Sequence, residues 1–385
     1  MRGLELGLGD NCASDTLLRL SSNSPGGLLF PKLESLTWDI YPTRSALPLF
    51  HLFLSPRLRR VILIANFPKT QGHLLIPLAQ MISALPTSVE RLSLMYGKGE
   101  EEPLKDALSS FVCQHGSSLK VFGACVPLSE PAIGHLAQLP NLSYCGIFQQ
   151  PPHVVPTSIF PSLEDVWLGR SEALPWLPLL ASHERDVLWN SSTSTTSYTN
   201  IRDSLKSLGL ASTIVDSTFL SSVVKFQNLV TLAIYSIDCS GELSCAFHLT
   251  DGDVENLASS IPRLKTLQLG SPCWFNSCDA TVASLVSISV HCLDLTVLET
   301  HFNTRTIVSD MQQLIDGGAE RDTAKCKLRG LAVGRLPLEV NEENIEAVAM
   351  GFKVIFPCLK DFEGYSGILR DDWHKVESKL GNLRR

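Results

Sequence analysis

The stretch Leu264-Lys-Thr-Leu267-Gln-Leu269 follows the pattern Leu-x-x-Leu-x-Leu, and conservative variants of this pattern recur along nearly the whole sequence. A strand motif that returns about every thirty residues is typical of repeat proteins. One wider interval contains the further copy Leu205-Lys-Ser-Leu208-Gly-Leu210, and Met1-x-x-Leu4-x-Leu6 begins the series. The other copies occupy residues 33–38, 58–63, 89–94, 119–122, 142–147, 163–168, 229–234, 295–298, 328–333 and 359–362.

Between the copies, apolar residues recur at helical spacing, so a helix is predicted after each strand. Thr250-Asp-Gly-Asp253 indicates a capping box at one helix start, and Pro131 fits the first turn of another. Proline precedes several strands, as in Phe160-Pro161. It marks the end of the helix that comes before the strand, because proline cannot continue a helix. The apolar faces include Leu104, Ala107, Leu108, Phe111 and Val112; Val254, Leu257, Ala258 and Ile261; Ile307, Met311, Leu314 and Ile315; and Ile345, Val348, Ala349 and Phe352.

Alternating strands and helices at this period predict an α/β fold of the leucine-rich-repeat, ribonuclease-inhibitor-like type. The expected architecture is a right-handed solenoid with a parallel concave sheet and outer helices. A doubly wound α/β domain is the alternative, but that fold gives no reason for one strand motif to recur. We expect a single solenoid over residues 1–385, interrupted by a polar loop at about 186–200, where the run from Asn190 to Asn200 breaks the pattern.

Composition excludes several classes of protein. The chain has 385 residues, is 44% hydrophobic and 18% charged, and carries a net charge of −7, so it contains ample material for a core. Residues 1–200 hold 14 Lys+Arg against 16 Asp+Glu and the remainder 18 against 23, so nucleic acid is not an expected partner. The chain shows no secretory segment and no apolar run long enough for a bilayer, and its 11 cysteines form no framework. These features predict an intracellular protein of the cytoplasm or nucleus, with no membrane partner.

Motifs for catalysis are incomplete, and we predict no enzyme, no cofactor and no metal. Gly97-Lys98-Gly99 lacks the remainder of a phosphate loop, and Gly364-Tyr365-Ser366-Gly367 is one residue short of a nucleophile elbow. The alternative is a zinc site in the region of Cys239, Cys245, His248, Cys273, Cys278, His291 and Cys292. Its cysteine spacing is wider than in structural zinc sites. Cys145 and Cys292 occupy positions where the repeat places buried apolar residues, which is the ordinary role of free cysteine.

The strand motif predicts which side chains face outward. Its second and third apolar positions point into the core, so the flanking residues lie on the concave face. Aromatic and charged side chains there favour protein binding, because exposed clusters of this kind often mark contacts. The alternative is that the segment 170–228 or a terminus folds over them. The candidate protein-binding residues are Arg60, Arg91, Tyr144, Phe148, Trp167, Tyr235, Glu299, His301, Asp361 and Tyr365.

The stretch from His248 to Tyr365 resembles fungal, mushroom-type F-box proteins with leucine-rich repeats. Upstream the likeness is limited to the repeat pattern. The resemblance rests on His248-Leu-Thr-Asp-Gly-Asp-Val254, Ser289-Val-His-Cys-Leu-Asp-Leu-Thr-Val-Leu-Glu-Thr-His-Phe-Asn303 and Val348-Ala-Met-Gly-Phe-Lys-Val-Ile-Phe-Pro357.

This resemblance implies the substrate-recognition repeats of a receptor in a cullin–RING ubiquitin ligase. In such receptors an F-box docks on the ligase adaptor and the repeats hold a protein substrate. No F-box is recognisable here, so we expect adaptor binding only from a longer form that contains one. We also expect residues 1–385 alone to self-associate, since the first repeat would expose Leu4, Leu6 and Leu8 at an uncapped end. The alternative is a free-standing repeat scaffold or inhibitor without a role in ubiquitination.

Overall fold

The computed structural model divides by its internal packing into two units. Unit 1 comprises Met1–Glu172 and Val187–Ser204, and unit 2 comprises Ala173–Asp186 and Leu205–Arg385. The prediction of a single solenoid stays a prediction, and the polar run at 186–200 lies outside the described residues. The structure describes residues 3–7, 19–20, 28–40, 47–65, 74–96, 102–149, 160–169, 173–181, 201–212, 214–236, 247–270, 279–317, 325–333, 342–364 and 371–382.

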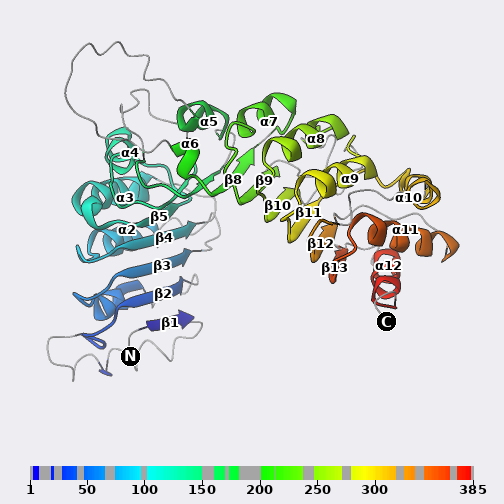
Figure 1. Cartoon of the computed structure of the whole chain (residues 1–385). Coiled ribbons are helices and arrows are strands. Elements are labelled where there is room, and N and C mark those ends of the chain that lie inside the picture. Colours follow the sequence, from blue (N-terminus) through cyan, green and yellow to red (C-terminus); the bar gives the residue numbers. More distant parts are fainter. Residues whose placement is uncertain are drawn as a thin grey trace, which may run out of the picture. The chain divides into compact units, whose positions relative to one another are not determined.

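Unit 1 contains a parallel sheet whose strands are neighbours in chain order. The strands are β1 (Gly3–Gly7), β2 (Ser35–Ile40), β3 (Arg60–Ala65), β4 (Arg91–Tyr96), β5 (Val121–Ala124), β6 (Tyr144–Ile147) and β7 (Asp165–Leu168). The chain returns between them through helices on one side of the sheet (Figure 1). These helices are η2 (Leu47–Phe53), α2 (Leu75–Ser83), α3 (Glu102–His115), η4 (Gly116–Ser118), α4 (Glu130–Ala137) and the short α6 (Ile201–Ser204).

Unit 2 repeats the same plan, again with parallel strands in chain order (Figure 1). Its strands are β8 (Ser207–Ser212), β9 (Thr231–Ser236), β10 (Thr266–Gly270), β11 (Val297–Thr300), β12 (Gly330–Val333) and β13 (Asp361–Gly364). Its helices are α5 (Ala173–Ala181), α7 (Ser217–Val223), α8 (Asp251–Ser260), α9 (Val282–His291), α10 (Ile307–Asp316), α11 (Glu342–Ile355) and α12 (Asp371–Asn382). Both units therefore confirm the predicted α/β leucine-rich-repeat solenoid.

The repeat motif sets the register of each sheet. In unit 1 the second motif position runs through adjacent strands, so that Leu36 pairs with Val61 and Val61 with Leu92. In unit 2 Leu232 pairs with Leu267 and Leu267 with Leu298. Burial alternates along the strands because successive side chains point to opposite faces, and these motif residues are fully buried. The predicted inward phase of the motif is confirmed.

The helices close the core on the inward face of each sheet. The apolar faces predicted for α3, α8 and α11 are buried, whereas on α10 Leu314 and Ile315 are only partly buried. Thr250 and Asp253 form the predicted capping box of α8, and Pro131 lies in the first turn of α4.

The amphipathic helix α12 packs against α11 and β13 in unit 2. The repeat motif does not predict this helix. It buries Trp373, Val376 and Leu380 and leaves the intervening polar residues exposed. The Trp373 ring centroid lies 5.8 Å from that of Phe362 and 6.4 Å from that of Phe352. The apolar face of α12 thus covers apolar residues of the neighbouring repeat and its polar face points outward, as in the capping elements of solenoids. Among the described helices, none combines the length and apolar character that crossing a membrane requires.

Candidate protein-binding surface

In each unit one face of the sheet packs against the described helices, and none of these helices covers the other face, which we call the open face. It carries the residues that flank the buried motif positions, which is where the sequence placed the candidate site. Arg60 and Arg91 begin β3 and β4, pair in register, and are both exposed. Two arginines therefore occupy adjacent positions on the open face of unit 1, where their guanidinium groups are accessible to carboxylates of a partner.

Tyr144 lies on the open face of unit 1 above two glycines of the sheet. A Cβ atom built on Gly123 would lie 3.4 Å from Tyr144 Cε1, and one built on Gly146 would lie 3.4 Å from Tyr144 Oη. The ring therefore packs along bare backbone and is only partly exposed. This burial, with smaller effects of Cys145 and Asp165, raises the pKa of the Tyr144 hydroxyl, so the phenol stays protonated and available to donate a hydrogen bond.

Trp167 and Phe148 complete a cluster that we call the ring patch, defined as Tyr144, Phe148 and Trp167. Trp167 pairs in register with Gly146 on the neighbouring strand and is partly exposed. A Cβ built on Gly169 would overlap the Phe148 ring, so this ring rests directly on that glycine. The rings of Tyr144 and Phe148 are thus held against the sheet, and all three rings keep part of their surface accessible.

The open face of unit 2 holds a hydrogen-bonded row of side chains across three strands. Tyr235 Oη donates to Gln268 Oε1 at 2.7 Å, and Gln268 Nε2 donates to Glu299 Oε2 at 3.1 Å. The row follows from the parallel register, which places β9, β10 and β11 side by side. Of these residues the sequence reasoning missed Gln268; its outward position between two apolar residues of the motif was the available signal.

His301 and two further carboxylates lie near this row. The His301 ring approaches Gly270, since a Cβ built there would lie 3.2 Å from His301 Nε2 and 3.8 Å from Glu299 Oε1. Ala332 pairs in register with both Glu299 and Glu363, so a small side chain separates the two acidic residues. Asp361 begins β13 and is exposed. The candidate Tyr365 lies outside the described residues.

Glu299 is half-buried, and this burial raises the pKa of its carboxyl group; the hydrogen bond from Gln268 lowers it and the charge of Glu363 raises it. At pH values above its folded-state pKa, the ionised Glu299 carboxylate therefore lowers the free energy of unfolding. This destabilisation disappears as the pH falls toward the pKa that the group has in the unfolded chain.

We expect Glu299→Gln, which keeps an acceptor for Gln268, to raise the Tm by about 1–3 °C at pH 7. At pH 4 both proteins should melt together. Thermal melts at the two pH values test this, and a lower Tm for the variant at pH 7 would contradict it.

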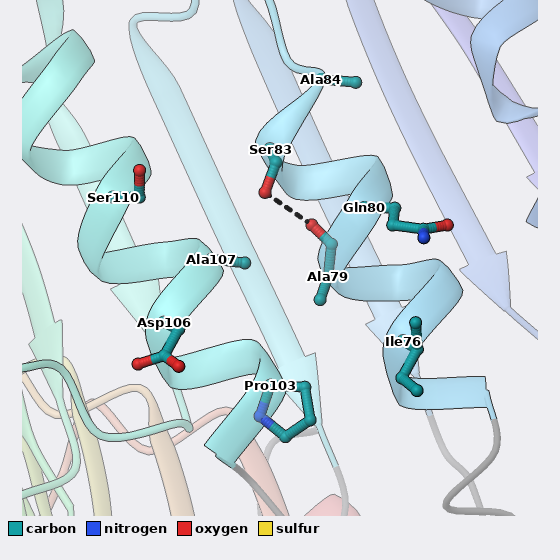
Figure 2. Close-up of a pocket in the computed structure, with 9 residues that line it drawn as sticks. All are labelled: Ile76, Ala79, Gln80, Ser83, Ala84, Pro103, Asp106, Ala107 and Ser110. Atoms are coloured by element: carbon teal, nitrogen blue, oxygen red, sulfur yellow. Dashed lines mark hydrogen bonds between the residues drawn. The ribbon is translucent and has the colours of Figure 1, made fainter.

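The helix side of unit 1 contains a shallow groove between α2 and α3. Figure 2 shows small side chains along its floor, among them Ala79, Ser83 and Ala107, with Ile76 at one end. The groove has a volume of about 530 Å³, and Ile76 is 59% exposed. It lies on the helix side of unit 1, opposite the ring patch. Substitutions in it can therefore serve as controls for binding at the ring patch.

The cysteines give no support for metal binding in the described part of the chain. Cys145 and Cys292 are buried as predicted, and burial raises the pKa of the Cys292 thiol to about 12. Within the described residues no three or more His, Cys, Asp or Glu side chains are grouped to hold a metal ion. Cys239, Cys245, Cys273 and Cys278 lie outside the described residues.

Parallel strands, outer helices and a repeated Leu-x-x-Leu-x-Leu motif place this fold in the leucine-rich-repeat class. No protein-family model matches the chain, and no curated protein matches it. Among solved structures, the leucine-rich-repeat-containing protein LegL7 from Legionella pneumophila is similar at 12% identity and a TM-score of 0.37. That likeness covers 99% of this chain and 98% of LegL7.

A second solved structure, the complex of TLR13 with ssRNA13, is similar at 11% identity and a TM-score of 0.33. It covers 98% of this chain but 53% of TLR13, so the chain spans about half the length of that protein. Both likenesses concern the fold alone. The RNA in that structure belongs to TLR13, and the expectation that this chain has no nucleic-acid partner stays a prediction.

Proposed function

We propose that this chain is a protein-binding repeat scaffold that contacts its partner through the open face. The observation that carries the proposal is the ring patch of unit 1, where Tyr144, Phe148 and Trp167 share a sheet face that none of the unit's described helices covers. Tyrosine, tryptophan and arginine are the residue types that contribute most to binding energy at protein interfaces. Arg60 and Arg91 supply the third of these types on the same face.

The geometry of the patch supports binding in a further way. Because Tyr144 lies along glycine backbone and Phe148 rests on Gly169, these two rings are already packed against the sheet in the absence of a partner. Ordered aromatic side chains lose little conformational entropy on binding, so more of the contact energy appears as affinity. The row Tyr235–Gln268–Glu299 gives the open face of unit 2 a polar counterpart, suited to hydrogen bonding rather than to apolar contact.

The partner is first identified by photo-crosslinking. A photoreactive amino acid replaces Trp167 in one protein and Ile76, on the helix side, in another; the crosslinked partner is then purified. We expect Trp167→Ala to weaken binding of the purified partner by about 2 kcal/mol or more, as interface aromatics do. Ile76→Ala removes a 59% exposed apolar side chain from α2 and should leave the affinity unchanged.

Calorimetry with both variants decides between two surfaces. Loss of affinity in Ile76→Ala alone would place the partner in the groove between α2 and α3 (Figure 2) and refute the open-face proposal. Equal affinity for both variants would refute the ring patch as an energetic centre.

A narrower role as the substrate-recognition repeats of a ubiquitin ligase receptor rests on the sequence resemblance of residues 248–365. In that role the crosslinked partner should be a degradation substrate, so its level should rise when this protein is removed and when the proteasome is inhibited. An unchanged level under both conditions would favour the free-standing scaffold or inhibitor. Neither role requires catalysis by this chain.

A further inference from the structure

The turns that lead into the strands of unit 2 are unusually basic. We call these turns the entry rim of unit 2. They comprise residues 205–206, 224–230, 261–265, 292–296, 325–329 and 356–360. They contain eight lysines and arginines against one carboxylate, Asp294, and all eight cations are exposed. Four of them immediately precede a strand: Lys206, Lys265, Arg329 and Lys360. The other four lie slightly earlier in the turns: Lys225, Arg263, Lys325 and Lys327.

Unit 1 provides an internal comparison, because the same repeat geometry produces the same turns there. Its entry rim holds four cations and three carboxylates. This rim comprises residues 28–34, 54–59, 84–90, 116–120, 138–143 and 160–164. Opposite charges there also meet: Lys120 Nζ lies 2.7 Å from Glu90 Oε2, and Arg59 Nη1 lies 3.5 Å from Glu90 Oε1. These partners lower the pKa of Glu90, the hydrogen bond from Lys120 contributing most.

The contrast excludes a purely local cause for the basic rim of unit 2. Helix C-termini attract cations, and the entry turns follow helix C-termini in both units. That effect would therefore enrich lysine and arginine equally in both entry rims, whereas the rim of unit 1 holds nearly equal numbers of cations and carboxylates. In unit 2 Lys327 pairs with Asp294 at 2.7 Å, but Lys265, Arg329 and Lys360 form no ion pair with any residue in the described part of the chain.

Backbone hydrogen bonds fix the spacing of the cations. Val230 N donates to Lys206 O, Lys265 N to Val230 O, Thr296 N to Lys265 O, Arg329 N to Thr296 O and Lys360 N to Arg329 O, at 2.7–3.0 Å. Neighbouring strands lie about 4.8 Å apart, so cations on alternate strands are separated by roughly 10 Å. A peptide in the extended polyproline II conformation covers about the same distance in three residues, and side chains three residues apart then lie on the same side of it.

From this arrangement we propose that the entry rim of unit 2 binds an extended acidic segment of a partner protein. Charge complementarity selects an anionic segment, and the cation spacing matches acidic side chains three residues apart. Nucleic acid fits less well, because single strands are bound by stacking on aromatic side chains interleaved with basic ones. The only aromatic residues of the rim, Phe226 and Phe356, are both fully buried. The rim shares no residue with the ring patch, so the inference would stand even if that patch bound nothing.

The test uses the full chain and a fluorescently labelled peptide of ten glutamates, with a ten-glutamine peptide and decauridylate RNA as comparison probes. Fluorescence anisotropy should show saturable binding of the glutamate peptide that weakens as salt rises, since exposed charges are screened. Lys265→Glu with Arg329→Glu should weaken it by about tenfold. The matched control, Lys32→Glu with Arg57→Glu, reverses one lysine and one arginine in the entry rim of unit 1 and should change the affinity less than about twofold.

Several results would overturn the proposal. They are an absence of glutamate-peptide binding, equal binding of the glutamine peptide, or equal losses in the two double variants. Tighter binding of the RNA than of the glutamate peptide at the same salt would assign the rim to nucleic acid instead. Circular dichroism verifies folding of each variant; should the reversal disturb it, Lys265→Gln with Arg329→Gln should still weaken peptide binding by about threefold.

Discussion

Replacing Phe352 with alanine is expected to destabilise unit 2 by about 3–5 kcal/mol, the usual cost of removing a fully buried aromatic ring. The side chain of Phe352 is 0% exposed. Its ring centroid lies 5.4 Å from that of Phe362, 6.4 Å from that of Trp373 and 6.5 Å from that of Phe302. One ring on α11 therefore contacts β13, the covering helix α12 and the segment that follows β11, and its loss would leave a cavity common to all of them.

A matched control lies two residues away on the same helix. Met350 is 40% exposed, so Met350→Ala should change stability by less than about 0.5 kcal/mol. Hydrogen exchange followed by mass spectrometry is the appropriate measurement, because a solenoid loses stability locally. In Phe352→Ala, exchange should accelerate in α11, β13 and α12. An equal acceleration throughout β1–β7 of unit 1, or equal effects of the two substitutions, would contradict the role of Phe352 as a local core residue of unit 2.

The second large effect is expected at Asp251, the first residue of α8. Its carboxylate accepts hydrogen bonds from Thr281 N and Thr281 Oγ1, both at 2.7 Å, and from Ser284 N at 3.1 Å and Ser284 Oγ. It therefore satisfies backbone donors at the start of α9, in the following repeat. Asp251→Ala would remove all of these acceptors and should cost about 2–4 kcal/mol.

Asp253 supplies the control, since it lies in the same helical turn but caps its own helix. Its carboxylate accepts from Thr250 N at 2.9 Å and Thr250 Oγ1 at 2.7 Å. Asp253→Ala should cost about 1 kcal/mol, the ordinary value of a cap. Urea denaturation compares the two, and Asp251→Asn, which keeps one acceptor oxygen, should fall between them. A larger loss in Asp253→Ala would show that the bond between repeats contributes less than the local cap.

Much of the fold could be predicted because the decisive information is local and periodic. Each copy of the motif alternates apolar and polar residues, so it encodes both the strand and the direction in which its side chains point. Even the irregular copy at Leu205 forms a strand, β8, with Leu208 paired to Leu232. Phe111 of α3 and Phe352 of α11 are buried as predicted for the same reason, because helical periodicity also lies within one segment.

The candidate surface was predicted less completely, because its character depends on neighbours about thirty residues away in the sequence. That Tyr144 and Trp167 face outward follows from the motif, but that Tyr144 lies on Gly123 and Gly146 depends on which strands adjoin. The link from Tyr235 through Gln268 to Glu299 likewise joins three repeats. Net charge misled in the same way, since a total of −7 for the whole chain conceals a basic rim confined to six turns.

The sequence by itself determined the repeat, the strands, their inward and outward faces and the helices between them. Those features arise from backbone geometry and hydrophobic periodicity within a single repeat. Only the tertiary structure decided which side chains of different repeats meet: Asp251 with Thr281 and Ser284, and Phe352 with Trp373 of α12. The reason is that stacking sets equivalent positions of successive repeats about 4.8 Å apart, and the contacts then depend on residue pairs that no single repeat contains.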